Sequence, residues 1–144
     1  MMHRNYIRPT ALEQLRIDAM MKGGCVLTMY RRERGLAVPP PAKTECHHIV
    51  RNNKRMGHLY TISLNVYYHQ GQRRPGSTAA EWRKLYGASL KDSMRVFRAS
   101  HGVDDLDLWQ YLQQLMGMST ELPVSKIYKR PALPAEALIS SIGD

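Results

Sequence analysis

The chain has 144 residues, of which 43% are hydrophobic, and this length suits one domain with a modest core plus an arm or tail. No stretch approaches the roughly 18 to 20 apolar residues that span a bilayer, and the N-terminus lacks the apolar segment of a secretory signal. The two cysteines, Cys25 and Cys46, are too few for a disulfide framework, so we expect a protein of the reducing cytoplasm.

Positive charge is concentrated in the middle of the chain. The net charge is +9, and residues 22–98 hold 15 Lys and Arg against 4 Asp and Glu, whereas the remaining residues are slightly acidic. A positive field confined to one region favours a polyanionic partner, most often nucleic acid. A merely solubilising surface is the alternative interpretation.

The N-terminal third begins with a clear helix signal. Residues 10–21 start with a threonine cap, and Glu13 three residues later completes a capping box. Leu12, Leu15 and Ala19 are expected to form the apolar face of this helix. The next apolar run, CVLTMY, has the composition of a strand, and the three prolines that follow predict a stiff connector.

Two apolar runs on either side of a polar turn predict a β-hairpin. Residues 44–50 (TECHHIV) and 58–64 (HLYTISL) are rich in strand-forming residues, and residues 51–57 (RNNKRMG) separate them. A short helix that begins near residues 63–65 would then carry His69.

Three further helices are predicted in the second half of the chain. They cover residues 78–86, 89–100 and 104–117, and glycines follow the first and the last of them. Each has a polar residue at its start that can act as the N-cap.

The last of these helices is amphipathic. Leu108, Leu112 and Leu115 are expected on one side, which suits either an intramolecular core or a dimer interface. Prolines recur from there to the end of the chain, so we expect a domain at residues 1–117 and a tail at 118–144. The tail would lie over the domain or extend to a partner.

Four of the six histidines, His47, His48, His58 and His69, lie in the predicted hairpin and short helix. Strand, turn, strand and helix is the order of a ββα-metal arrangement, in which one histidine binds a divalent cation and another deprotonates water. Adjacent strand residues point to opposite faces, so His47 and His48 can divide these two tasks. His69 would be a metal ligand, and His58 would orient the base or bind phosphate. A single such histidine would more simply be a surface residue, but the group favours a functional site.

Basic residues accompany the histidines. Arg51, Lys54 and Arg55 lie in the hairpin turn, and Arg73 and Arg74 follow the short helix. We expect them to contact DNA phosphates, which would fix the position of the protein on DNA without reading its sequence.

The segment CHHIVRNNKRMGHLYTISL, followed by YHQG and EWRKLYGASL, resembles phage HNH proteins of the recombination-enhancement (Ref) family over roughly residues 24–117. The resemblance implies an α+β fold with a ββα-metal (His-Me finger, HNH) core, flanking helices and an extended C-terminal tail. It also implies a nuclease that cuts DNA with a divalent cation in the cytoplasm of the bacterial host. In the Ref prototype, RecA filaments on DNA direct the cutting, so DNA and a RecA-like filament are the expected partners.

The resemblance also implies roles for single residues. Of His47 and His48, one would be a metal ligand and the other the general base, and the resemblance does not assign which is which. His69 would be the metal ligand from the helix. His58 occupies the Gly-His step of the family. Family members can offer another histidine after the helix, where this chain reads QRRPGST, so the ion would need water or phosphate oxygens. Mg²⁺ or Mn²⁺ is expected, because Mg²⁺ tolerates a water-rich shell.

Relatives usually carry a CxxC after the first helix and a Cys-x-x-His-His at the last one, which together can hold a structural zinc. In this chain Cys25 retains the first of these four ligand positions. The other three positions hold Thr28, Asn65 and Tyr68 in place of two cysteines and a histidine. A lone thiolate cannot make a tetrahedral site, so we expect no structural zinc and tyrosines in its volume. Cys46 as a substitute ligand is the alternative.

Three functions are compatible with these patterns. The leading hypothesis is a metal-dependent HNH endonuclease of phage or prophage origin that acts in DNA recombination or processing. The main alternative is a catalytically degenerate DNA- or protein-binding module, either a recombination accessory or an anti-defence protein. A structural protein that dimerises through its last helix is the third, and the oligomeric state stays open.

Overall fold

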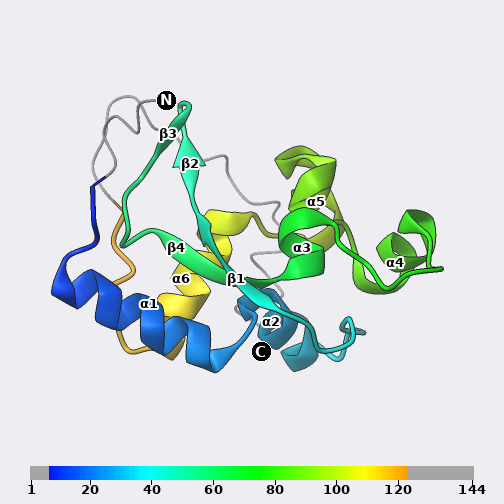
Figure 1. Cartoon of the computed structure of the whole chain (residues 1–144), viewed down its shortest axis with the longest axis horizontal. Coiled ribbons are helices and arrows are strands. Elements are labelled where there is room, and N and C mark those ends of the chain that lie inside the picture. Colours follow the sequence, from blue (N-terminus) through cyan, green and yellow to red (C-terminus); the bar gives the residue numbers. More distant parts are fainter. Residues whose placement is uncertain (1–6, 123–144) are drawn as a thin grey trace.

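The computed structural model of the chain describes residues 7–122 and has a mixed α+β architecture, as the sequence predicts, with helices around a long β-hairpin (Figure 1). The elements are α1 (Ala11–Gly23), α2 (Val26–Glu33), β1 (Thr44–His48), β2 (Val50–Arg51), β3 (Lys54–Arg55), β4 (Thr61–Asn65), α3 (Val66–Gln70), α4 (Ala79–Tyr86), the 3₁₀ helix η1 (Leu90–Asp92), α5 (Met94–His101) and α6 (Asp105–Leu115). Within residues 7–122, no helix is both long enough and apolar enough to cross a membrane.

The predicted hairpin is confirmed, and its two ends form separate short ladders. β1 pairs antiparallel with β4, with His48 opposite Thr61, and β2 pairs with β3 at the tip. Asn52 and Asn53 make the turn at the tip with φ angles of 53° and 62°, the left-handed conformation that two-residue hairpin turns require. Ile49 lies between β1 and β2, and its backbone N–H donates to Tyr60 O while its carbonyl oxygen accepts from Met56 N–H, so both bonds go to the segment between β3 and β4. α3 follows β4 directly, so the order strand, strand, helix is present.

The second strand of the hairpin is shorter than predicted. Residues 58–64 were expected to be extended, but β4 begins at Thr61 and His58 lies in the preceding turn. Tyr60 N–H donates to Gly57 O at 3.0 Å and closes this turn, and Gly57 has a φ of 118°. Between the two ladders, residues 56–60 of the return segment lie opposite the single residue Ile49, so they cannot all pair with it and form a turn instead.

The strand expected at residues 25–30 is wrong, because these residues begin helix α2. Cys25 caps this helix by accepting a hydrogen bond at Sγ from a backbone N–H one turn later. Val26, Leu27 and Arg31 face the interior. The apolar residues of this segment alone suit a strand. The buried face shows helical spacing only when Arg31 is included with Val26 and Leu27.

The apolar face predicted for α1 is also wrong. Leu12 and Leu15 are 79% and 64% exposed, whereas Arg16 is buried. The Arg16 guanidinium donates to Gln113 Oε1 at 2.7 Å and to Thr61 Oγ1 and O at 2.8 and 3.0 Å, and burial lowers its pKa to about 10. These bonds connect α1 to β4 and α6. The face of α1 that carries Arg16 is therefore buried, and the face that carries Leu12 and Leu15 is exposed.

The helix predicted at residues 89–100 is divided into η1 and α5. The break is at Ser93, whose φ is 104° and whose hydroxyl accepts from Val96 N–H to cap α5. Of Ser77 and Thr78, the two residues that could precede the next predicted helix, Thr78 is the N-cap of α4, and Asn65 is the N-cap of α3, within the range predicted for the start of that helix. Local capping chemistry thus sets most helix starts.

Helix α6 packs most of its predicted apolar side into the core. Leu108 and Leu112 are buried, which makes this face intramolecular, but Leu115 is 55% exposed because the last turn passes beyond the core. Residues 118–122 return along α6, whose glutamines donate to their backbone carbonyls. The rest of the predicted tail, residues 123–144, lies outside the described residues, so the division at residue 117 stays a prediction.

His101 ends α5 inside the core, and its neighbours fix its tautomer. Arg31 Nη1 lies 3.2 Å from His101 Nδ1 and can only donate, so Nδ1 accepts, while Nε2–H donates to Ala88 O at 2.8 Å. A Cβ on Gly87, at a φ of 84°, would meet the ring at 2.3 Å, which explains the glycine after α4. Burial lowers the pKa of His101 from 6.5 to about 4. The hydrogen bond to Ala88 acts in the opposite direction and raises the pKa, and the positive charge of Arg31 lowers it further.

We expect the free energy of unfolding to decrease as the pH falls from about 6.5 to about 4. In this window the unfolded His101 binds a proton and the folded one does not, so stability rises with pH by about 2 to 3 kcal/mol across it. His101→Gln retains a donor for Ala88 O and an acceptor for Arg31 without titrating. Urea unfolding at several pH values should therefore show a weaker pH dependence in the variant, and identical slopes would contradict the assignment.

Candidate active site

The two adjacent histidines of β1 face different partners. The His47 ring lies edge-on to His69 of α3, with centroids 5.3 Å apart and planes at 72°. The His48 ring lies in the same way against His58, at 5.3 Å and 76°. The alternation of side chains along a strand produces this division, and it brings all four predicted histidines into two neighbouring pairs.

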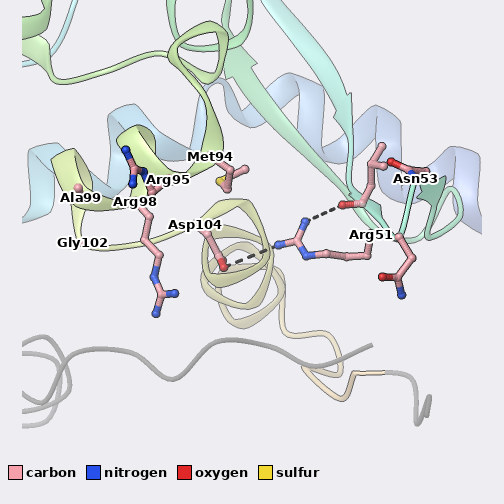
Figure 2. Close-up of a pocket in the computed structure, with 10 residues that line it drawn as sticks. Arg51, Asn53, Met94, Arg95, Arg98, Ala99, Gly102 and Asp104 are labelled. Carbon is pink, nitrogen blue, oxygen red and sulfur yellow. Dashed lines mark hydrogen bonds and ion pairs between the residues drawn. The ribbon is translucent and has the colours of Figure 1, made fainter. Parts of the chain in front are cut away.

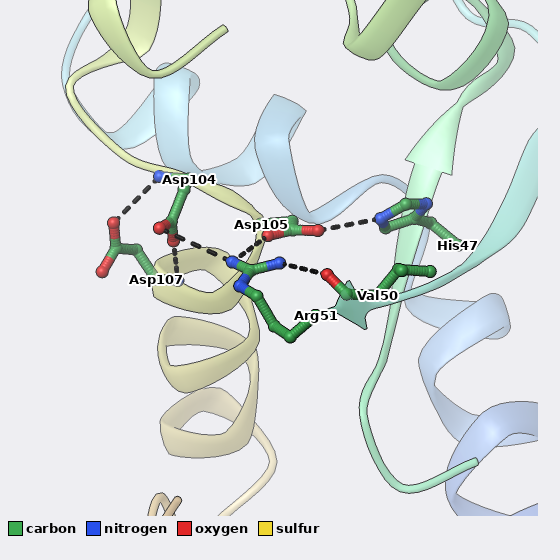
Figure 3. Close-up of polar contacts among 6 residues, drawn as sticks. All are labelled: His47, Val50, Arg51, Asp104, Asp105 and Asp107. Atoms are coloured by element: carbon green, nitrogen blue, oxygen red, sulfur yellow. Dashed lines mark hydrogen bonds and ion pairs between the residues drawn. The ribbon is translucent and has the colours of Figure 1, made fainter. Parts of the chain in front are cut away.

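Asp105, the first residue of α6, holds His47 from the other side (Figure 3). His47 Nε2 lies 3.0 Å from Asp105 Oδ2, and Asp105 Oδ1 accepts from Arg51 Nη2 at 2.8 Å. Burial alone would raise the pKa of Asp105, but the hydrogen bonds from His47 and Arg51 outweigh it and hold the pKa below its usual range. The carboxylate therefore stays charged and fixes the imidazole through Nε2, which leaves Nδ1 of His47 to bind other groups.

Sequence reasoning missed Asp105 as a site residue and treated it only as part of the start of a helix. Asp104 and Asp107 already form the capping box of α6, with bonds of 2.8 and 2.9 Å (Figure 3). The second of two consecutive aspartates was thus not needed as a cap. An aspartate that the helix cap does not require indicates another role for Asp105, but the sequence does not identify His47 as its partner.

Glu45 holds His69 in a matching way. Glu45 Oε1 accepts from His69 Nδ1 at 2.9 Å and from Gln70 Nε2 at 2.7 Å. The hydrogen bond from His69 is the main reason that the pKa of Glu45 is lowered, and burial opposes it. Nδ1 of His69 is thus engaged by Glu45, and Nε2 is the other ring nitrogen. Sequence reasoning missed Glu45 too, although it lies two residues before His47 and therefore on the same face of β1.

His48 and His58 form a hydrogen-bonded chain with a defined direction. His58 Nε2 bonds to the carbonyl oxygen of Ile7, which can only accept, so this nitrogen carries the proton. His58 Nδ1 then accepts from His48 Nε2–H at 3.2 Å, and Nδ1 of His48 keeps its lone pair. Burial, aided by the positive Arg55, lowers the pKa of His48 to about 4. At neutral pH this imidazole is uncharged and can accept a proton.

The residues present fit a divalent cation with few protein ligands. Two imidazoles in contact, His47 and His69, each have one nitrogen bonded to a carboxylate, which is how metal-binding histidines are oriented. Among residues 7–122, no group of three or more His, Cys, Asp or Glu side chains could hold a metal ion. The binding of Mg²⁺ or Mn²⁺ stays a prediction.

The sequence of this chain matches a family model described as recombination enhancement, RecA-dependent nuclease, over residues 9–117. The chain belongs to this family. The predicted resemblance to the Ref family is confirmed, and both histidine pairs, Glu45 and Asp105 lie within the matched range. The family description connects the chain with nuclease activity, DNA recombination and RecA. No curated protein and no solved structure matches the chain significantly.

The basic residues predicted to bind DNA lie at the hairpin tip and in the loop after α3. Lys54 and Arg55 are exposed at the hairpin tip, while Arg51 is turned inward to the aspartates at the start of α6. Arg73 and Arg74 lie in the loop after α3, and Arg73 is partly buried there. Their contact with DNA stays a prediction.

The four positions predicted to have lost a structural zinc make other contacts in the structure. Cys25, Thr28 and Asn65 line one cavity of about 490 Å³ beside the prolines at 39–41. Cys25 and Asn65 are engaged as the N-caps of α2 and α3. Tyr68 is fully buried, and its hydroxyl donates to a backbone carbonyl of α4 at 2.9 Å. The expectation that no structural zinc binds here stays a prediction.

Proposed function

We propose that the chain is a metal-dependent HNH endonuclease of phage or prophage origin that cuts DNA during recombination in the cytoplasm of the bacterial host. The hairpin strands β1 and β4 with α3 would be its ββα-metal core. The observation that carries this proposal is the division of the histidine pair. His47 faces His69 of the helix, and His48, one residue later, faces His58 with a lone pair left to accept a proton.

The proposed roles follow from the hydrogen bonds. His47 and His69 would hold the cation, with Asp105 and Glu45 orienting their rings. A divalent cation in this place would stabilise the negative charge that develops on the phosphate and the leaving oxygen. His48 would take the proton of the attacking water at Nδ1, because its Nε2–H is committed to His58.

DNA and RecA are the proposed partners. Lys54 and Arg55 at the hairpin tip, with Arg73 and Arg74 after α3, would contact phosphates on either side of the histidines. A RecA filament would bring DNA to the enzyme, and the RecA dependence named in the family description supports this proposal. Because phosphate contacts release counterions, DNA binding should weaken steeply as salt increases.

The test is a cleavage assay on circular single-stranded and supercoiled DNA, with and without a RecA filament. With Mg²⁺ or Mn²⁺ we expect nicking or linearisation that is strongest in the presence of RecA, and none in EDTA. Equal cleavage in EDTA would exclude the metal-dependent mechanism. DNA binding without cleavage in every metal would favour the catalytically degenerate binding module instead.

A further inference from the structure

A cavity of about 700 Å³ lies beside the histidine site, between the hairpin tip and α5 (Figure 2). Val50, Arg51 and Asn53 contribute to its wall from the hairpin, and Met94, Arg95 and Arg98 contribute from α5. The roles proposed above for the histidines do not use this space. Its volume is within the range of roughly 300 to 1,000 Å³ that small-molecule sites occupy.

The cavity is linked directly to the proposed active site. Arg51 lines it and donates to Asp105 Oδ1 at 2.8 Å, and Asp105 in turn bonds to His47 at 3.0 Å. Asp104, 3.7 Å from the same guanidinium, is part of the cavity wall. A ligand in the cavity would therefore contact Arg51, which is separated from His47 by the single side chain of Asp105.

The lining combines an apolar surface with positive charge. Val50, Met94 and Ala99 supply the apolar part, and Val50 is 44% exposed. Arg51, Arg95 and Arg98 line the same space, and the Arg51 guanidinium is paired with Asp104 and Asp105. An apolar ligand would gain nothing from three arginines, and a bare phosphate would gain nothing from the apolar part.

A nucleotide matches both halves of this lining. Bases stack on apolar side chains and on guanidinium planes, and phosphates form charge-assisted bonds with arginine. In a duplex the faces of the bases are covered by their neighbours, so only an unstacked base can enter such a cavity. We propose that the cavity binds one unstacked nucleotide of the DNA strand, next to the cleaved phosphodiester, with its phosphate held by Arg95 and Arg98. This inference rests on the proposed function and specifies its substrate as single-stranded or locally unpaired DNA.

Two exposed positions on α5 allow the test without disturbing the core. Arg95→Glu reverses a charge in the lining, and Ala99→Glu places a carboxylate in the apolar part. Lys84→Glu, on the exposed surface of α4 and outside the cavity lining, makes the same charge change as Arg95→Glu and is the matched control.

Binding is measured in EDTA with a short single strand that carries 2-aminopurine at successive positions, and with the duplex of the same sequence. We expect wild-type protein to change the emission of 2-aminopurine at one position of the single strand. Arg95→Glu should weaken single-strand binding about tenfold or more and lower the salt dependence by about one phosphate contact. Ala99→Glu should weaken it too, whereas Lys84→Glu and duplex binding should change little.

Four results would overturn the inference. Equal weakening by all three variants would mean general electrostatic attraction, and equal effects on the duplex would exclude an unstacked base. Normal DNA binding with loss of only RecA-stimulated cleavage would assign the cavity to a protein partner. A wild type that cuts DNA while the cavity variants bind normally refutes this inference alone, whereas a wild type that never cuts refutes the proposed function.

Discussion

His48→Ala is expected to lower the rate of DNA cleavage by about 10²- to 10⁴-fold, the contribution of a positioned general base. The hydrogen bond to His58 leaves Nδ1 of His48 as the proton acceptor, and burial keeps the ring neutral at pH 7 by lowering its pKa to about 4. Alanine removes the acceptor and leaves His47 and His69 in place. The rate should be measured by single-turnover cleavage at saturating Mg²⁺ or Mn²⁺.

The matched comparison is His58→Ala, which retains the proposed base but removes the acceptor of its Nε2–H. Its loss of rate should be smaller than that of His48→Ala, and His58→Asn should recover part of it because the amide oxygen can accept the same bond. Both alanine variants should bind DNA in EDTA as the wild type does. If His48→Ala cuts at the wild-type rate, His48 is not the base.

The parts of the site that the sequence predicts are those set by neighbouring residues. The strands of the hairpin follow from apolar composition around a polar turn, and the Asn65 cap starts α3 where the pattern indicates. The opposite directions of His47 and His48 follow from strand geometry alone. His69 then arrives beside His47 because α3 continues directly from the strand that pairs with β1.

The parts that the sequence does not predict depend on distant residues. Asp105 is 58 positions from His47, and only the packing of α6 against β4 brings it there. Arg16 is buried because Gln113 and Thr61 satisfy its guanidinium, and nothing near it in the chain indicates this. Arg31 of α2 is buried in a similar way, with partners at Leu85 and His101. Buried arginines with distant partners thus account for the errors in the predicted faces of α1 and α2.

Asp105→Asn is expected to raise the Mg²⁺ or Mn²⁺ concentration needed for half-maximal cleavage by about 10- to 100-fold, the usual effect of losing a carboxylate that orients a metal-binding histidine. The asparagine keeps the shape of the side chain but loses the charge that fixes His47 Nε2–H and pairs with Arg51. Because Asp105 is only 2% exposed, the variant should also be less stable.

Asp107→Asn separates these two effects, because Asp107 lies on the same helix and belongs to the capping box rather than to the His47 pair. It should lower the free energy of unfolding by about 0.3 to 1 kcal/mol, because the first turn of α6 loses a negative charge, and leave the metal requirement unchanged. A titration of cleavage rate against metal concentration, combined with urea unfolding, measures both quantities for each variant. If Asp105→Asn lowers stability but has the metal requirement of the wild type, the carboxylate only packs α6 against the hairpin. A raised metal requirement in Asp105→Asn alone would connect the start of α6 to the ion, through a contact that joins two elements far apart in the sequence.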